Sequence, residues 1–280
     1  SLSNVTVFYN LFVKKEGQQG VTWQIVKDQL ALLSASAAWP SVGRVRIVSL
    51  GAKAKSGLCD KCEIIEHRDE GSELVTIEHL HNFCKTNPLA TVAYMHDKGS
   101  LNNRGGLNER LRNMHMRSIA ACIASPNNLL AESSCDVCAA RFSIVPHWHT
   151  SGNMWVTRCD YVRKLIAPAK MKAAMARTYA HDNEALAVQW NVGLGRFSME
   201  HWVMTHPSIR PCDVFPGEGF TFGYDGIPVN DDWEPNLIPS PRFPLSTFAQ
   251  AADRNECKCS WRQRSLKNRW AEWEALGYKN

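Results

Sequence analysis

The stretch VTVFYNLFV at residues 5–13 begins the pattern that decides the fold. It is rich in β-branched and aromatic residues, which is typical of a buried strand. Apolar residues at helical spacing follow over 21–36, and RVRIVSLG at 44–51 predicts a second strand that ends in glycine. A strand, a helix and a strand in this order predict a βαβ unit, whose two strands lie parallel in one sheet.

The alternation of strands and helices continues as far as residue 125. A short third strand is expected at 62–67, and TVAYMHDKG at 91–99 predicts a fourth. Helices are expected at 73–88, where a proline stops the pattern, and at 106–123. This rhythm predicts an α/β fold with a Rossmann-like, mostly parallel sheet flanked by helices. Ligands of such sheets bind beyond the carboxyl ends of the strands, so polar residues at those ends are candidates for a site.

The pattern changes in the second half of the chain. A strand, a polar turn and a further strand that leads into helices are expected first, and glycine- and proline-rich turns dominate after Pro211. A last helix is expected to begin near Ser260, which forms a capping-box pattern with Gln263. We therefore predict one α/β domain over 1–210 and an irregular C-terminal extension over 211–280 that packs on the same domain.

Composition and charge exclude some classes of protein. With 44% apolar and 21% charged residues, the chain has the composition of a globular protein. No apolar run approaches the ~20 residues of a membrane span, so a membrane is expected as a partner only through an N-terminal anchor upstream of residue 1. The net charge is +5, and residues 254–280, with seven basic side chains against three glutamates, hold +4 of it. A nucleic-acid-binding protein more often carries a basic face within its fold, so nucleic acid is not an expected partner.

The ten cysteines allow several interpretations. Two C-x-x-C pairs, Cys59 with Cys62 and Cys135 with Cys138, could supply four thiolates to a zinc ion. The pairs lie far apart in the sequence, however, and disulfides in an oxidising lumen or free thiols are expected rather than zinc. Other cysteines, such as Cys84 and Cys122, lie within helical apolar patterns and are expected to be plain buried thiols.

The first candidate site is YMHDKGS at residues 94–100, where the fourth strand ends. Asp97 could hold a divalent cation and Lys98 could neutralise a phosphate. Gly99 would let the backbone approach a ligand closely. Arg112, on the following helix, is expected to return toward the same place. The alternative is a charged turn that binds nothing.

The second candidate is PHWHTSGNMW at residues 146–155. If it is extended, His147 and His149 point the same way and could bind zinc or manganese, although a third ligand is missing. The turn at 151–153 lies between Trp148 and Trp155, and aromatic faces beside amides suit a sugar ring. The alternative places both tryptophans in the core and bonds the histidines to the backbone.

The third candidate is SMEHWVMTHP at residues 198–207. Glu200 stands at the start of an apolar helical stretch. A carboxylate near a sugar could act as a general base toward an acceptor hydroxyl. The alternative is that Glu200 only complements the dipole of its helix.

Taken in order, these stretches resemble a family of GT-A-like nucleotide-sugar glycosyltransferases of algae, bacteria and large algal viruses. Its members carry Y-x-H-x-K-G, then a helix with an arginine, then H-x-x-G-N-x-W ahead of Y-x-x-x-L. The matching residues here are Tyr94–Gly99, Arg112, His149–Trp155, Tyr161 and Leu165. The resemblance covers roughly residues 5–207.

The resemblance implies a Rossmann-like domain that binds a nucleotide-diphosphate-sugar donor and transfers the sugar to a glycan or glycoprotein acceptor. It implies a site in the secretory pathway or Golgi lumen, with the cytoplasm as the alternative. It also implies Mn²⁺ or Mg²⁺ as a cofactor with Asp97 as ligand, but this chain lacks the D-x-D motif of such sites. Lys98 or Arg112 could therefore neutralise the leaving diphosphate instead.

The resemblance also assigns roles to individual residues. Asp97 and Glu200 are implied to be catalytic. Those implied to bind the nucleotide-sugar are Phe8, Tyr9, Asn10, His96, Lys98, Gly99 and Arg112. Those implied to contact the donor sugar or the acceptor are His149, Ser151, Gly152, Asn153 and Trp155. Two rival functions stay open: a catalytically silent carbohydrate- or protein-binding member of the fold, and a zinc-stabilised nucleic-acid-binding module.

Overall fold

The computed structural model describes most of the first 214 residues. The described ranges are 4–13, 19–100, 106–124, 135–140, 142–143, 149–150, 152–178, 198–214 and residue 277. The predictions for His147, Trp148 and Ser151 lie outside these ranges. So do those for nearly all of the 211–280 extension, including its terminal helix.

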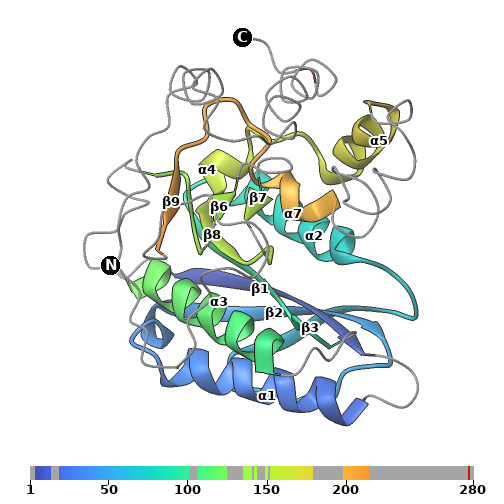
Figure 1. Cartoon of the computed structure of the whole chain (residues 1–280), viewed down its shortest axis with the longest axis vertical. Coiled ribbons are helices and arrows are strands. Elements are labelled where there is room, and N and C mark those ends of the chain that lie inside the picture. The colour runs from blue at the N-terminus through green and yellow to red at the C-terminus, as the bar shows by residue number, and fades with distance from the viewer. Residues whose placement is uncertain are drawn as a thin grey trace.

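Seven strands form one sheet in the order β3-β2-β1-β4-β8-β5-β9 (Figure 1). Their bounds are Val5–Val13 for β1, Val42–Gly51 for β2, Cys62–Arg68 for β3, Thr91–His96 for β4, Val137–Ala139 for β5, Trp155–Arg158 for β8 and Pro211–Asp213 for β9. β1 pairs in parallel with β2 and β4, and β2 pairs in parallel with β3. β8 is antiparallel to both β4 and β5, and β5 is parallel to β9. A short hairpin of β6 (Phe142–Ser143) and β7 (His149–Thr150) lies outside this sheet. The predicted α/β fold with a mostly parallel sheet is confirmed.

Helices cover both faces of the sheet (Figure 1). α1 (Gln19–Ala35) and α3 (Gly106–Ala124) lie on one face, and the short helix η1 (Trp39–Ser41) leads from α1 into β2. The other face carries α2 (Glu73–Thr86), α4 (Cys159–Val162), α5 (Pro168–Thr178) and α7 (Ser198–Trp202). Among the described residues, no helix is both long and apolar enough to cross a membrane.

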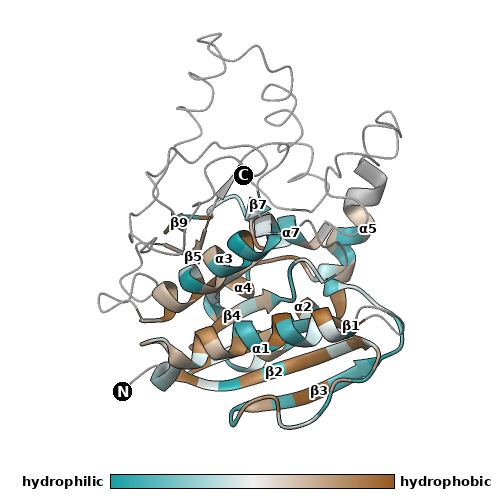
Figure 2. Ribbon diagram, turned by 60° about the horizontal axis from the view of Figure 1, so that its bottom comes forward, coloured by the Kyte–Doolittle hydropathy of each residue, from teal (hydrophilic) through white to brown (hydrophobic). Residues whose placement is uncertain are grey.

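The side-chain alternation of β1 divides the core into two layers. Val7, Tyr9 and Leu11 belong to the cluster under α1 and α3, whereas Phe8 belongs to the cluster under α2. Successive side chains of a strand point to opposite faces, so a central strand covered on both faces is apolar along most of its length. Figure 2 shows β2 largely in the hydrophobic colour and the helices in mixed colours, as expected for amphipathic helices on a buried sheet.

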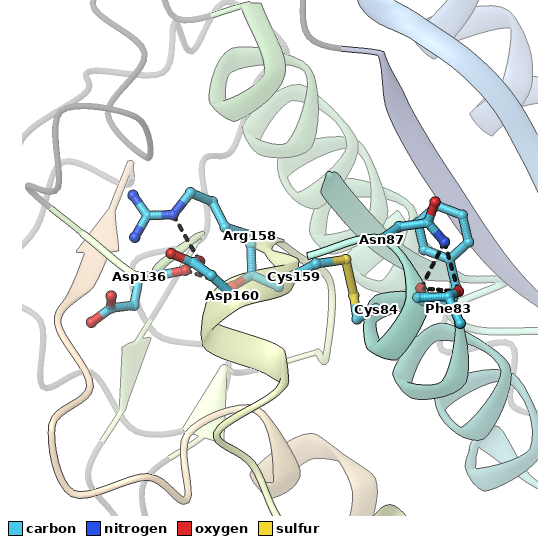
Figure 3. The surroundings of a disulfide bond; sticks show 9 residues. Phe83, Cys84, Asn87, Asp136, Arg158, Cys159 and Asp160 are labelled. Carbon is cyan, nitrogen blue, oxygen red and sulfur yellow. Dashed lines mark hydrogen bonds and ion pairs between the residues drawn. A yellow bond between two sulfur atoms is a disulfide. The ribbon is translucent and has the colours of Figure 1, made fainter. Parts of the chain in front are cut away.

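Disulfides join four pairs of the described cysteines. They are Cys59–Cys62, Cys84–Cys159, Cys122–Cys138 and Cys135–Cys212. The prediction of plain buried thiols at Cys84 and Cys122 is therefore wrong: both are buried, but each is bonded to a cysteine of another element. Figure 3 shows Cys84 of α2 joined to Cys159 at the start of α4. The four-thiolate zinc site is also wrong, because a disulfide sulfur is not a thiolate and cannot serve as such a ligand.

Candidate functional site

The order of the strands reverses at β1, which has β2 on one side and β4 on the other. At such a switch point the connections leave in opposite directions, and the carboxyl ends of the two strands frame a ligand position. His96, the last residue of β4, lies opposite Asn10 of β1. Just beyond it, the Phe12 N–H donates a hydrogen bond of 3.2 Å to Oδ2 of Asp97. We refer to this place as the switch-point edge.

His96 connects the switch-point edge to the Gly-Asn turn that precedes β8. Its Nε2 lies 2.8 Å from the carbonyl oxygen of Gly152. Because a carbonyl only accepts hydrogen bonds, Nε2 carries the hydrogen. Burial lowers the pKa of His96, and the nearby Lys98 ammonium adds to this effect, while Glu73 acts against it. The imidazole is therefore a neutral donor that holds the turn in place.

Glu73 is the residue around which the next part of the site is built. Its Oε2 accepts hydrogen bonds from the Tyr94 hydroxyl, at 2.9 Å, and from Nδ2 of Asn153. Asn153 in turn accepts a hydrogen bond of 2.9 Å from Nε1 of Trp155. Asn153 is fully buried and has a left-handed φ of 45°, which asparagine tolerates better than most residues. One carboxylate thus fixes residues from β4 and from the turn before β8.

Glu73 is not among the site residues expected from the sequence, although a signal for it is present there. Ser72 caps α2 through a 3.4 Å bond from the Leu74 N–H, so Glu73 is the first residue of that helix. The helix of a βαβ unit begins beside the carboxyl ends of the strands. An acidic residue in that position could therefore have been assigned to the switch-point edge together with His96.

Two cations and a second carboxylate complete the cluster. Nζ of Lys98 lies 3.9 Å from Oε1 of Glu200, whose helix, α7, comes from a distant part of the chain. These side chains are 20% and 14% exposed, so both can still reach solvent or a ligand. NH1 of Arg112 donates a 3.0 Å hydrogen bond to the Lys98 carbonyl, and burial lowers the pKa of its guanidinium. Nε of Arg112 is buried and has no hydrogen-bond partner within the described part of the chain.

Asp97 is buried at the same edge. Burial raises the pKa of its carboxyl group to about 8, although hydrogen bonds from the Ser100 hydroxyl and the Phe12 N–H act against the rise. Asp97 and Glu200, with Glu73, also raise the pKa of the buried Tyr94 hydroxyl further than burial alone does. Three acidic residues therefore act on one place, next to Lys98 and Arg112.

The structure does not leave the side chain of every expected residue available to a ligand at the switch-point edge. Phe8 packs against Phe83 within the core, with ring centroids 5.6 Å apart. The Tyr9 hydroxyl donates to Oε1 of Gln29 at 2.7 Å, and Asn10 accepts from Thr76 at 2.8 Å. Phe8 thus lies in the core, whereas Tyr9 and Asn10 lie beside the edge with their polar groups bonded to other parts of the protein.

The second motif is also only partly brought to this edge. Trp155 is fully buried, and the centroid of its ring lies 5.4 Å from that of Tyr94. It therefore lies in the core, as the alternative interpretation of this motif predicted. His149 lies in β7, which packs beside α7. Gly99 has a φ of +90° and passes close to Asn108 of α3, so its backbone freedom serves the turn itself.

The expected cation, Mn²⁺ or Mg²⁺, finds few ligands among the described side chains. The described ranges contain no group of three His, Cys, Asp or Glu residues placed to hold a metal ion. Asp97 alone offers a carboxylate with neighbouring N–H and O–H donors, which does not match the several oxygen ligands these ions take. We therefore derive no step through a metal, and the expectation of metal dependence stays a prediction.

The Gly152 turn allows a test of the contact with α3. A Cβ at Gly152 would lie 2.3 Å from Nε2 of His115, and its φ is +91°. We expect Gly152→Ala to lower the free energy of unfolding by about 2–4 kcal/mol, from backbone strain and the clash together. Gly57→Ala is the matched control, because its φ of +75° is similar and no atom lies within 4 Å. Equal losses in urea unfolding of the two variants would contradict the close approach of the turn to His115.

Asp97 predicts an unusual dependence of stability on pH. The ordinary pKa of this carboxyl group is 3.8, and in the folded protein it is about 8. Between these two pH values, the carboxyl group has lost its proton in the unfolded chain but keeps it in the folded protein. Unfolding then releases a proton, so stability attributable to this group falls as pH rises, by at most about 1.4 kcal/mol per pH unit. Asp97→Asn should match the wild type near pH 4 and be more stable near pH 8. Urea unfolding of both proteins from pH 4 to pH 8 checks this prediction. A difference in free energy of unfolding that stays constant with pH would contradict the raised pKa.

Comparison with known proteins places this α/β protein in a family. The model of a domain of unknown function, DUF8361, matches residues 8–280, so the chain belongs to that family. No curated protein and no solved structure matches the chain.

Proposed function

We propose that this protein is a GT-A-type glycosyltransferase that moves a sugar from a nucleotide-diphosphate donor to a glycan or glycoprotein acceptor. The observation that carries the proposal is the convergence of three separate stretches at the switch-point edge. His96 bonds Gly152 at 2.8 Å, and Lys98 lies 3.9 Å from Glu200. These residues belong to the three candidate stretches of the sequence, 94–100, 146–155 and 198–207.

The charges at this edge suit a diphosphate leaving group. The Arg112 guanidinium bonds the backbone carbonyl of Lys98 at 3.0 Å, so two cationic residues meet at the end of β4. Preorganised cations stabilise negative charge that develops in a transition state. Nε of Arg112, which is buried and unpaired within the described residues, offers one donor for a phosphate oxygen.

Glu200 is the proposed general base. In the transfer, the acceptor hydroxyl gives its proton to this carboxylate while its oxygen bonds to the anomeric carbon of the donor. The bond from that carbon to the diphosphate oxygen breaks, and the electron pair leaves with the nucleotide diphosphate. Lys98, 3.9 Å from Glu200, is the proposed partner of the negative charge on the leaving diphosphate.

The buried hydrogen bonds of the cluster keep these groups in place. Glu73 fixes Tyr94 and Asn153, and His96 fixes Gly152. Side chains locked in this way hold catalytic groups within the narrow tolerance that transfer reactions require. We propose that they position the donor sugar beside Glu200.

An oxidising compartment accords with the proposal. All eight described cysteines are in disulfides, and these persist mainly in secreted and lumenal proteins. We therefore propose the secretory pathway or Golgi lumen as the place of action.

A thermal-shift screen tests donor binding. UDP-, GDP- and CMP-linked sugars are added one at a time, each with and without manganese. At about 100 times the dissociation constant, a bound donor stabilises the protein by about 2.7 kcal/mol, which raises Tm by roughly 5 °C or more. We expect this for a UDP- or a GDP-linked sugar. A CMP-linked sugar carries a single phosphate, so a response to it alone would contradict a diphosphate donor. A flat response to all three would overturn the proposal, and binding without transfer would favour the catalytically silent relative.

A further inference from the structure

One of the four described disulfides differs from the others in its surroundings. Cys59 and Cys62 are partly exposed. The six cysteines of the remaining pairs are all buried: Cys84, Cys122, Cys135, Cys138, Cys159 and Cys212. Thiol–disulfide exchange needs a thiolate to reach a sulfur atom, so access separates this pair from the rest.

The Cys59–Cys62 disulfide also differs from the other disulfides in the length of the loop that it closes. Cys59 and Cys62 are three positions apart in the C-x-x-C spacing, whereas Cys84–Cys159 and Cys135–Cys212 span 75 and 77 positions. A disulfide restricts the unfolded chain less when its loop is shorter. Opening the Cys59–Cys62 ring therefore costs the fold less than opening the long-range pairs.

Other contacts hold the same turn without the disulfide. Nζ of Lys61 donates 2.7 Å hydrogen bonds to the carbonyls of Trp39 and Val42, and it lies 4.5 Å from the centre of the Trp39 ring. The Val45 N–H donates to the Lys61 carbonyl at 2.9 Å, which joins the turn to β2. The turn thus has its own anchor, and the bond between the sulfurs can open while the turn stays in place.

We propose that Cys59–Cys62 is a thiol–disulfide exchange site that accepts two electrons from dithiol donors. A thiolate of the donor attacks one of the two sulfurs, forms a mixed disulfide and releases the other cysteine as a thiolate. The second donor thiol then attacks the mixed disulfide and releases the second cysteine. The donor leaves as a disulfide, and the two cysteines gain the two electrons and two protons that it has lost.

This site is separate from the switch-point edge. Cys62 is the first residue of β3 and pairs with Val45, near the start of β2. The amino ends of parallel strands lie at the edge opposite their carboxyl ends, where Lys98 and Glu200 are found. The exchange reaction can therefore succeed or fail independently of sugar transfer.

Graded reduction with trapping tests the proposal. The folded protein is exposed to increasing dithiothreitol, alkylated, and analysed by peptide mass spectrometry, with near-ultraviolet circular dichroism recorded in parallel. We expect Cys59 and Cys62 to be labelled together at a dithiothreitol concentration at least 10-fold below that of any buried pair, with the tryptophan bands of the spectrum unchanged. Labelling of a buried pair first, or of Cys59 and Cys62 only as the spectrum is lost, would overturn it.

Lys61→Met provides the matched variant. Without the ammonium, the turn loses its bonds to Trp39 and Val42, so reduction should now change the spectrum around the tryptophan. The same variant in its oxidised form should keep the wild-type spectrum. If the reduced variant also keeps the wild-type spectrum, Lys61 is not the residue that holds the turn when the disulfide opens. The proposed role of Lys61 as the anchor would then be wrong.

Discussion

Replacing both cysteines of the Cys84–Cys159 pair by alanine is expected to lower the free energy of unfolding by about 4 kcal/mol. The disulfide joins residues 75 positions apart, and the loop-entropy relation gives about this value for so long a loop. Both residues are also fully buried in the core under α2, so truncation leaves space that the core must refill. A shift of this size lowers Tm by roughly 10 °C.

The control for this prediction is Cys59→Ser with Cys62→Ser. That pair closes a ring over three positions and is partly exposed, so the same relation gives at most about 2 kcal/mol. Calorimetry of both double variants is the measurement. A smaller loss for the buried, long-range pair than for the partly exposed, short one would contradict a structural role for the Cys84–Cys159 bond, which Figure 3 shows.

Glu200→Gln is expected to reduce sugar transfer by about 10²- to 10⁴-fold, which is the range for loss of a general base. The amide keeps the size of the side chain but cannot take a proton from the acceptor hydroxyl. Donor binding should change little, because Lys98 and Arg112 remain. Turnover with excess donor, together with the donor dissociation constant, separates the two effects.

Asp160→Asn is the matched control for Glu200→Gln. It also converts a carboxylate into an amide and loses an ion pair, the 2.9 Å contact with Arg158. That pair lies beside Thr91, at the start of β4, and not at its carboxyl end. Near-normal turnover in Glu200→Gln, or an equal loss in both variants, would remove Glu200 from the mechanism.

Local patterns were enough to predict the elements of the fold. The β-branched and aromatic run at 5–13 became β1 over Val5–Val13, and the proline-terminated pattern at 73–88 became α2 over Glu73–Thr86. Alternating strands and helices also implied the parallel pairing of β1, β2, β3 and β4. These features depend on neighbours in the sequence, which is why sequence reasoning finds them.

Long-range features were not predictable in the same way. The partners of Cys84 and Cys122 are set by which elements pack together, and no spacing rule in the sequence reveals them. The antiparallel direction of β8 likewise depends on the path of the chain. At the site, the motif that includes Asn153 indicated the right turn, but the burial of Trp155 and the role of Glu73 depend on how α2 meets that turn.

The central claim, that a nucleotide-sugar binds at the switch-point edge beside Lys98, is tested most directly by titration calorimetry. The donor identified by the screen is titrated into the wild type, Lys98→Met and Lys85→Met, the last removing an exposed lysine at the far end of α2. A charge-assisted hydrogen bond to a phosphate is worth about 1.5–3 kcal/mol, so Lys98→Met should bind about 10- to 100-fold more weakly. Lys85→Met should bind like the wild type. Equal affinity in all three proteins, or no binding heat from any donor, would contradict the claim.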